Sequence, residues 1–183
     1  EKGAVLVSSL NEEDILDFAR LFDDDNACTG WDGGCFLFAC HEENITISGE
    51  GVIYGQGDKV FIDDDVDGGA HECPLSVTAF RPRTTFLEDV TNLTVRDITI
   101  QDAAFWTLHM AGCHHVRVQD IKILNDVRGA NNDGIDPDCC KDVLITGCLV
   151  KTGDDAIVIK TTKPMTQRYG ASENIVISNC ILY

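Results

Sequence analysis

Two short runs of the sequence carry the residues with the clearest chemical potential. The first is Asn-Asn-Asp-Gly-Ile-Asp at 131–136, and the second is Gly-Asp-Asp-Ala-Ile at 153–157. Together they supply three carboxylates that could meet at one site, Asp133, Asp154 and Asp155. Such a cluster can hold one acid protonated while its neighbours are ionised, which acid/base cleavage of a glycosidic bond requires.

The doublet of Asp154 and Asp155 carries more weight than the single Asp-Gly step at 133–134. Asp and Gly are common turn residues, so an isolated Asp-Gly pair usually has a structural role. The doublet instead comes directly before the apolar run 156–159, where we expect a core strand to begin. Two adjacent charges in such a place cost free energy unless they serve a function.

Other polar and aromatic residues near these runs indicate structural roles. Asp136 and Asp138 flank Pro137, and Asp-Pro-Asp is typical of a turn, so we expect these acids only to shape the chain. Trp106 and His109 are expected to pack and to form turn hydrogen bonds rather than to react.

A repeated pattern in the rest of the chain would position the acids. Five segments each begin with a polar residue and continue with alternating β-branched or apolar residues. Their leading apolar residues are Ile45, Leu93, Val116, Val143 and Ile175. A small or polar corner residue follows each segment: Gly49, Asp97, Asp120, Gly147 and Asn179. Period-2 alternation excludes helical repeats, and short strands repeated without helices are typical of a parallel β-solenoid.

The fold class predicted from this repeat is all-β, a parallel β-helix that forms one domain over residues 1–183. Successive coils of such a helix are one strand spacing apart, about 4.8 Å. Asp133 would lie on one coil, with Asp154 and Asp155 on the next, so the three acids could converge on one face. Adjacent coils are compatible with the roughly 6.5–9.5 Å that separates an inverting pair of carboxyl groups.

The polar residues that lead the segments predict a ladder along one corner of the solenoid. Asn44, Asn92 and Asn174 would each bond the backbone of the next coil through the side chain. His115 and Asp142 occupy the same place in the other two segments and would interrupt the ladder.

The first 80 residues are less regular, and neither end carries a capping pattern. An Asn cap and an acidic first turn predict a short helix over 11–22, and the stretch 55–82 predicts a long excursion between coils. The chain opens in a strand-like segment without an initiating Met or a signal peptide, and Tyr183 falls within another. We therefore expect a fragment of a longer catalytic domain, with a β-helix incomplete at both ends.

The charge and hydrophobicity of the chain restrict which molecules it can bind. The net charge of −17, without a basic patch, argues against nucleic acids and anionic membranes. No apolar run approaches the roughly 18 residues of a membrane span. A polyanionic substrate would have to rely on local cations. The sequence leaves the oligomeric state unknown, although exposed solenoid ends would favour association of the isolated chain.

Neither a metal nor another cofactor is expected. The run 63–68 resembles the start of a calcium loop, but Pro74 stands where that loop requires a bidentate Glu. None of the nine cysteines forms a C-x-x-C pair of the zinc-ribbon kind. Four recur at strand positions and are expected to stack as small buried residues: Cys113, Cys140, Cys148 and Cys180. A single disulfide remains open among three others: Cys28, Cys35 and Cys40.

The two acidic runs, N-N-D-G-I-D followed by T-G-D-D-A-I-V-I-K, resemble the signature of glycoside hydrolase family 28, the polygalacturonase family. Three further segments are similar to landmarks of that family: Asn44–Gly57, Arg81–Arg83 and Phe105–His109. The resemblance covers nearly the whole chain. It implies a right-handed parallel β-helix and inverting hydrolysis of pectic polysaccharide, of the polygalacturonan or rhamnogalacturonan type. Because pectin is extracellular, it also implies a secreted or periplasmic protein.

The resemblance also implies a role for each site residue. Asp154 would be the general acid that protonates the leaving oxygen, while Asp133 and Asp155 would position and deprotonate the attacking water. Asn131 would orient the cluster or the substrate. Lys160 falls on a Lys of the family pattern and is a candidate substrate contact, although it could equally be a solvated strand end.

The chain departs from the family pattern at three points. Asn132 replaces the usual Thr, and Tyr54 replaces an Asp. The family's downstream G-H-G and R-x-K motifs, which would bind the substrate carboxylate, do not follow Asp155. We therefore expect little or no activity from the isolated 183-residue chain.

Two alternatives to a hydrolase stay open at this point. A calcium-dependent pectate lyase shares the β-helix but needs an Arg base, and no Arg is evident beside the acids. A non-catalytic carbohydrate-binding β-helix would tolerate Asn at all three acidic positions.

Overall fold

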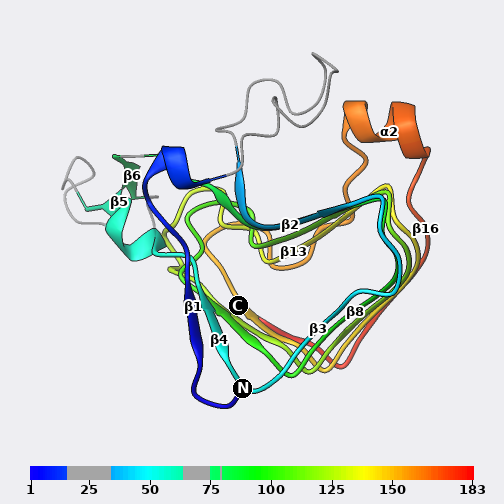
Figure 1. Cartoon of the computed structure of the whole chain (residues 1–183), viewed down its shortest axis with the longest axis horizontal. Coiled ribbons are helices and arrows are strands. Elements are labelled where there is room, and N and C mark those ends of the chain that lie inside the picture. Colours follow the sequence, from blue (N-terminus) through cyan, green and yellow to red (C-terminus); the bar gives the residue numbers. More distant parts are fainter. Residues whose placement is uncertain (16–33, 64–74, 79) are drawn as a thin grey trace.

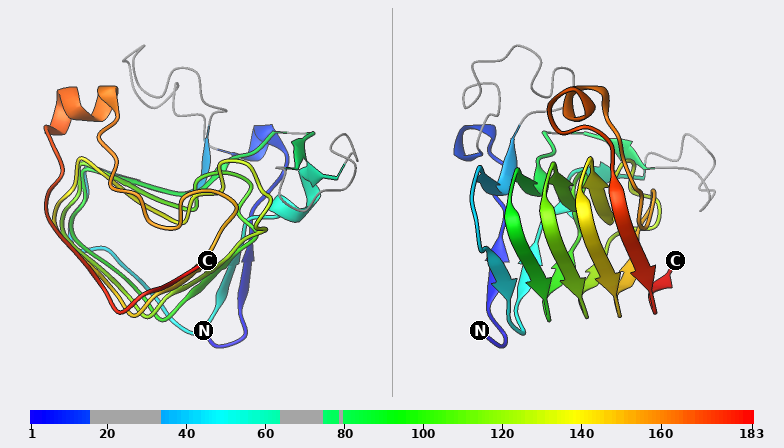
Figure 2. Two further views of the ribbon diagram at one scale, coloured as in Figure 1. Left: turned by 180° about the vertical axis from the view of Figure 1, so that it is seen from behind. Right: turned by 90° about the vertical axis from the view of Figure 1, so that its right-hand side faces the viewer.

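The computed structural model describes residues 1–15, 34–63, 75–78 and 80–183. The chain winds through these residues as a right-handed parallel β-helix, which confirms the predicted fold class (Figure 1). Three parallel sheets form its walls, and strands of successive coils stack side by side along each wall (Figure 2).

Each wall collects equivalent strands of successive coils. The first sheet contains β2 (Cys35–Cys40), β7 (Arg83–Glu88), β10 (Leu108–Ala111) and β13 (Ile135–Asp138). The second contains β3 (Thr46–Ser48), β8 (Thr91–Arg96), β11 (His114–Gln119), β14 (Lys141–Thr146) and β16 (Glu173–Ser178). The third contains β1 (Val5–Val7), β4 (Val52–Tyr54), β9 (Thr99–Gln101), β12 (Lys122–Leu124), β15 (Leu149–Lys151) and β17 (Ile181–Leu182).

The core is built by stacking like residues from coil to coil. In the second sheet, Val116 pairs in register with Leu93 on one side and Val143 on the other, and all three side chains are buried. Burying each such side chain stabilises the fold by about 1.5–3 kcal/mol. The alternating pattern of the sequence therefore records which residues face the inside of the β-helix.

The corners after the second sheet require a left-handed backbone. All five predicted corner residues have positive φ, between 52° and 132°: Gly49, Asp97, Asp120, Gly147 and Asn179. Gly, Asp and Asn adopt this conformation at the lowest cost. The turn between the second and third sheets is thus fixed by residue type, which confirms the predicted corners.

The predicted ladder exists, but its bonds join side chains rather than side chain and backbone. Asn92 Nδ2 donates to Asn44 Oδ1 at 3.1 Å, and Asn174 Nδ2 donates to Asp142 Oδ1 at 3.0 Å. These residues and His115 all have positive φ of 55–60°, so equivalent side chains of neighbouring coils meet directly. Asp142 does not interrupt the ladder, because its carboxylate accepts as an Asn oxygen would.

The N-terminal segments agree in part with expectation. A 3₁₀ helix, η1 (Glu12–Asp14), begins after Asn11, whose side chain accepts from the Glu13 amide. It ends before Ile15, which is extended, contrary to the predicted helix over 11–22; residues 16–22 lie outside the described residues. The excursion holds η2 (Gly57–Lys59) and the antiparallel pair β5 (Phe61–Ile62) and β6 (Ser76–Val77). Most of the calcium-like run lies outside the described residues.

The cysteines of the strands are stacked core residues. Cys113, Cys140 and Cys148 are buried free thiols and belong to the main hydrophobic cluster, as predicted. Cys180 is half-buried and packs against the same cluster. Cys40 is also a free thiol, and Cys28 lies outside the described residues. No helix in the described part of the chain is long and apolar enough to cross a membrane.

A short helix, α2 (Lys163–Tyr169), lies outside the first sheet (Figure 1). Its Met165 is buried in a cluster with Phe86, Ala111 and Cys139 of that wall. Arg168 and Tyr169 both donate to the buried Glu88 carboxylate, at 3.0 Å and 2.8 Å. These contacts anchor the chain directly after residues 154–160.

Candidate active site

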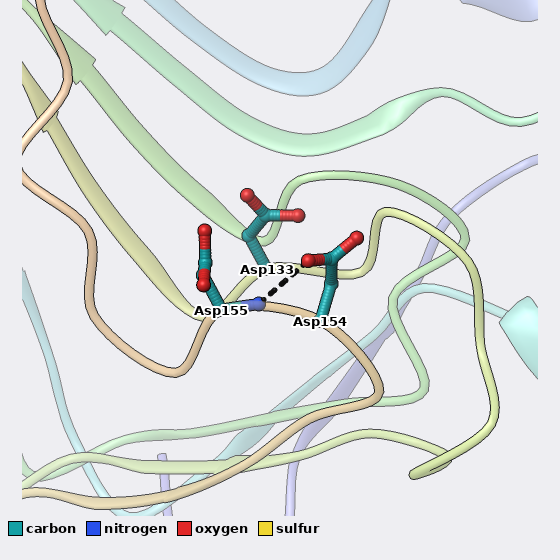
Figure 3. A group of neighbouring side chains, drawn as sticks. All are labelled: Asp133, Asp154 and Asp155. Atoms are coloured by element: carbon teal, nitrogen blue, oxygen red, sulfur yellow. Dashed lines mark hydrogen bonds between the residues drawn. The ribbon is translucent and has the colours of Figure 1, made fainter. Parts of the chain in front are cut away.

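The structure brings the three carboxylates of the acidic runs together. Asp133 lies in the turn before β13, and Asp154 and Asp155 lie in the turn that follows β15 on the next coil. One oxygen from each side chain lies within 4.8 Å of the others. Figure 3 shows the three carboxyl groups on the same side of the two turns.

The backbone of adjacent coils fixes the two turns relative to each other. The Thr107 amide donates to the Asp133 carbonyl oxygen at 2.9 Å, and the Gly134 amide donates to the Asp155 carbonyl oxygen at 2.9 Å. Within the second turn, the Asp155 amide donates to Asp154 Oδ1 at 3.0 Å (Figure 3). The carboxylates are therefore carried by a ladder that runs through three coils.

The burial of the acids is opposite to the expectation from sequence. Asp133 is only 3% exposed, whereas Asp154 and Asp155 are exposed. Residues 156–159 do not form a core strand; this stretch joins β13 only through isolated bridges such as that between Ile135 and Ile157. The prediction that the doublet opens a core strand holds in part: Ala156 and Ile157 pack against the main core and stack on β13, but they are only half-buried and form bridges rather than a continuous strand.

Lys160 neutralises the buried acid. Its Nζ donates to Asp133 Oδ2 at 2.8 Å, and its side chain is 14% exposed, so it is not a solvated strand end. Burial raises the pKa of Asp133, Lys160 opposes that rise, and the neighbouring Asp154 adds to it. Burial alone would lower the pKa of Lys160, but Asp136 and Asp133 more than compensate and raise it. Lys160 therefore remains an ammonium ion beside Asp133.

Asp136 is a fourth acid of this group that the sequence did not assign to it. It lies in β13, is fully buried, and has Oδ1 3.6 Å from Lys160 Nζ. Neither of its carboxyl oxygens has a hydrogen-bond partner among the described residues. Burial, followed by the charge of Asp133, raises the pKa of Asp136 well above its ordinary value. Burial and the charge of Asp133 therefore favour the neutral form of Asp136, and Lys160 opposes them.

Asp138 anchors the same strand to the segment after Lys160. It accepts from the Thr162 amide at 2.9 Å and the Thr162 hydroxyl at 2.6 Å, and lies 3.4 Å from His109 Nε2. Burial would raise its pKa, but hydrogen bonds from His109 and Thr162 outweigh that effect and lower it. The turn predicted around Pro137 was wrong. Proline is tolerated in this strand because the next coil pairs with it only through isolated bridges.

An aromatic and cationic layer supports the acids from the preceding coil. Phe105 and Trp106 are stacked with ring centroids 5.5 Å apart, and Lys160 Nζ lies 4.1 Å from the Trp106 centroid. His109 packs edge-on against Trp106 at 4.9 Å, and burial lowers the pKa of His109 to about 4. His109 is thus a neutral packing residue, as expected.

Asn131 lies at the edge of the cluster and is held by an arginine. It has a positive φ of 55°, and its Oδ1 accepts from Arg81 at 3.0 Å. Arg81 also donates to the Ala130 carbonyl oxygen at 2.8 Å and lies 4.7 Å from the Phe105 centroid. The sequence offered Arg81 only as part of a family landmark, so its hydrogen bond to Asn131 was missed.

The three carboxylates are also the residues that could hold a cation. Among the described residues, they form the one group of His, Cys, Asp or Glu side chains whose ligand atoms come close enough for this. Lys160 already supplies a positive charge to Asp133, which weakens the attraction for a metal ion. The expectation of a metal-free site stays a prediction.

Fold and site together define a β-helical protein with a solvent-facing carboxylate cluster, and comparison with known proteins identifies its family. Residues 27–182 match the model of glycosyl hydrolases family 28, and the chain belongs to this family. It is 30% identical over 139 residues to a polygalacturonase of Chamaecyparis obtusa, covering 75% of this chain and 25% of that protein. It is 31% identical over 113 residues to an exopolygalacturonase of Oenothera organensis, covering 62% and 30%.

A solved protein structure has the same fold as this chain. The polygalacturonase of Erwinia carotovora superposes with a TM-score of 0.75 at 21% identity, over 98% of this chain and 47% of that chain. The chain therefore spans about a quarter of the length of the curated relatives it matches and about half of this structure.

Proposed function

We propose that this protein is a glycoside hydrolase that cleaves pectic polysaccharide, of the polygalacturonan or rhamnogalacturonan type, with inversion of the anomeric centre. The observation that carries the proposal is the convergence of Asp133, Asp154 and Asp155 within 4.8 Å, in a chain of glycosyl hydrolases family 28. The relatives whose names state a substrate class are polygalacturonases. Secretion or a periplasmic location follows from that substrate class.

Asp154 acts as the general acid in this proposal. Its carboxyl group is exposed, so a glycosidic oxygen can reach it, and it lies beside the two other acids of the cluster. It donates a proton to the leaving oxygen as the glycosidic bond breaks.

Asp133 and Asp155 act on the attacking water. A water that donates hydrogen bonds of about 2.8 Å to two oxygens brings those oxygens about 4.5 Å apart. Oxygens of this cluster lie within 4.8 Å of one another, so one water fits between a pair of them. Asp133, paired with Lys160, is the buried member that can take the proton as the water attacks.

The separation of the acids makes stereochemistry an informative measurement. The closest oxygens are nearer than the roughly 6.5–9.5 Å that usually separates the carboxyl groups of inverting enzymes. Inversion remains the proposed outcome, because two acids that share one water leave neither free to attack the sugar. Proton NMR of the first product formed would show the inverted anomer, and the retained anomer would contradict the proposal.

Local cations explain how a chain of net charge −17 could bind a polyanion. Arg81 holds Asn131 at the edge of the cluster, and Lys160 lies among the acids. We propose that Asn131 and Lys160 contact the substrate next to the scissile bond. Arg81 lies 3.0 Å from Asn131, and Lys160 lies 2.8 Å from Asp133.

The test of the function is Asp154→Asn, made in a form of the protein that contains the whole catalytic domain, because little or no activity is expected of the 183-residue chain alone. We expect kcat on polygalacturonate to fall by at least about 100-fold, because a general acid contributes 10²–10⁴-fold to rate. The exposed corner residue Asp97 provides the matched control, and Asp97→Asn should keep the parent's kcat. Retained turnover in Asp154→Asn would refute the assignment.

The same assay separates the two alternative functions. Products that absorb in the ultraviolet through a new double bond would identify a lyase. Binding of the sugar without turnover would identify a carbohydrate-binding protein.

A further inference from the structure

Asn132 lies between the two turns that carry the acids and is fully buried. Its Oδ1 accepts from the Gly153 amide at 2.7 Å, across the gap between successive coils. Its Nδ2 donates to the Asp126 carbonyl oxygen at 2.8 Å. One partner is a donor and the other an acceptor, so the two bonds fix the orientation of the amide, with Oδ1 toward Gly153 and Nδ2 toward Asp126. Gly153 directly precedes the Asp154–Asp155 doublet, and Asp133 directly follows Asn132.

A second buried amide continues this connection toward the preceding coil. Asn125 Nδ2 donates to the Asn132 carbonyl oxygen at 2.9 Å and to Thr107 Oγ1 at 2.8 Å. Its Oδ1 accepts from the Ala103 amide at 2.9 Å. Two asparagine side chains thus link three coils beneath the acids, and these five hydrogen bonds are 2.7–2.9 Å long.

The surrounding backbone leaves room for the Asn132 amide and little more. A Cβ on Gly129 would lie 2.2 Å from Asn132 Nδ2, and a Cβ on Gly153 would lie 2.4 Å from the Gly129 carbonyl oxygen. Both glycines therefore permit the close approach of the two turns around this side chain. The space between the two turns therefore matches the size of the Asn132 side chain.

We propose that Asn132 is a positioning residue of the active site, whose side-chain amide sets the distance between Asp133 on one coil and the Asp154–Asp155 turn on the next. It touches neither substrate nor reacting atoms, and it acts by holding the Gly153 amide. The kinetic part of this inference rests on the proposed hydrolase function, but the geometric part does not.

The kinetic test is Asn132→Ala, assayed on polygalacturonate at temperatures where the variant is folded. We expect kcat to fall about 10–100-fold while KM changes less than about threefold, because a displacement of 1 Å at reacting groups can cost 10²-fold in rate. The matched control is Asn92→Ala, which removes an exposed amide bond between coils far from the acids and should leave kcat unchanged. Lowered thermal stability with unchanged kcat in Asn132→Ala would mean a structural role only and would overturn the proposal.

A crystal structure of the same variant tests the geometry without any assay. We expect the closest oxygens of Asp133 and Asp154 to separate beyond 4.8 Å. Acids that stay in place would overturn the positioning role even if the protein proves inactive on pectic substrates, so the two failures are distinguishable. If Asn132→Ala does not fold, Asn132→Thr decides. Its hydroxyl can both donate and accept, but it reaches about 1.2 Å less far than the amide, so we do not expect it to span the gap between Gly153 and Asp126. An intermediate loss of kcat is therefore expected, and an unchanged kcat would contradict the proposal.

Discussion

Asp133 and the Asp154–Asp155 turn contribute to one carboxylate cluster but lie in opposite environments. Asp133 is buried and paired with Lys160 at 2.8 Å, whereas Asp154 and Asp155 face solvent and make no ion pair within the described residues. The ionisation of Asp133 is therefore set by fixed protein groups. The exposed doublet is instead surrounded mainly by water.

This difference predicts which residues matter for stability and which only for chemistry. Removing a partner from a buried ion pair leaves an uncompensated charge, which is costly. Removing an exposed charge usually changes the free energy of unfolding by less than about 0.5 kcal/mol. The proposed general acid should therefore be replaceable without loss of fold, while the lysine behind the buried acid should not.

The largest effect on stability is expected for Lys160→Met. Leaving Asp133 buried without its ammonium partner should lower the free energy of unfolding by about 3–5 kcal/mol near neutral pH, as measured in urea. It should also raise the pKa of Asp133 further, so the acidic limb of the kcat/KM profile moves to higher pH. Asp155→Asn is the exposed comparison and should stay within about 0.5 kcal/mol of the parent. A loss below about 1 kcal/mol for Lys160→Met would contradict this account.

A smaller effect of opposite sign is expected for Asp136→Asn. The pKa of Asp136 in the folded protein is raised, so its contribution to stability is present at low pH and is lost as pH rises through that value. An Asn cannot ionise and keeps a similar shape, so the variant should be about 1–3 kcal/mol more stable than the parent near pH 7. The gain should vanish near pH 3, and urea unfolding at both pH values measures it. Equal stability at neutral pH would show that Asp136 is not buried as the structure has it.

The smallest effect is expected from removal of divalent metal ions. Because Lys160 already balances the buried acid, treatment with a chelator should leave kcat and the melting temperature unchanged. Loss of turnover that calcium alone restores would instead support the lyase alternative, with a cation held by the three carboxylates.

Several parts of this molecule could be predicted from sequence because they follow local rules. Alternation of Val, Ile and Leu specified the stacked strands, and Gly, Asp or Asn at five equivalent corners specified the left-handed turns. The convergence of the acidic runs followed from the coil period. Each of these features depends on residue type at a fixed interval, which repeats along a solenoid.

Other features escaped sequence reasoning because they depend on packing between coils. The Asp-Pro-Asp segment has the composition of a turn, yet the fold places Asp136 and Asp138 in a buried strand. The apolar run after Asp155 has the composition of a core strand, yet it joins β13 of the first sheet only through isolated bridges and is half-buried. Neighbours distant in sequence overrode local preference in both cases.

The sequence by itself determined the repeat, the class of fold and the identity of the three acids, since these are properties of residue type and spacing. Only the tertiary structure decided which acid is buried, that Lys160 is its partner, and that the amide of Asn132 bridges the two turns. Burial and hydrogen bonding arise where separate coils meet, and the free energies of charged and polar groups depend on those surroundings more than on their own chemistry.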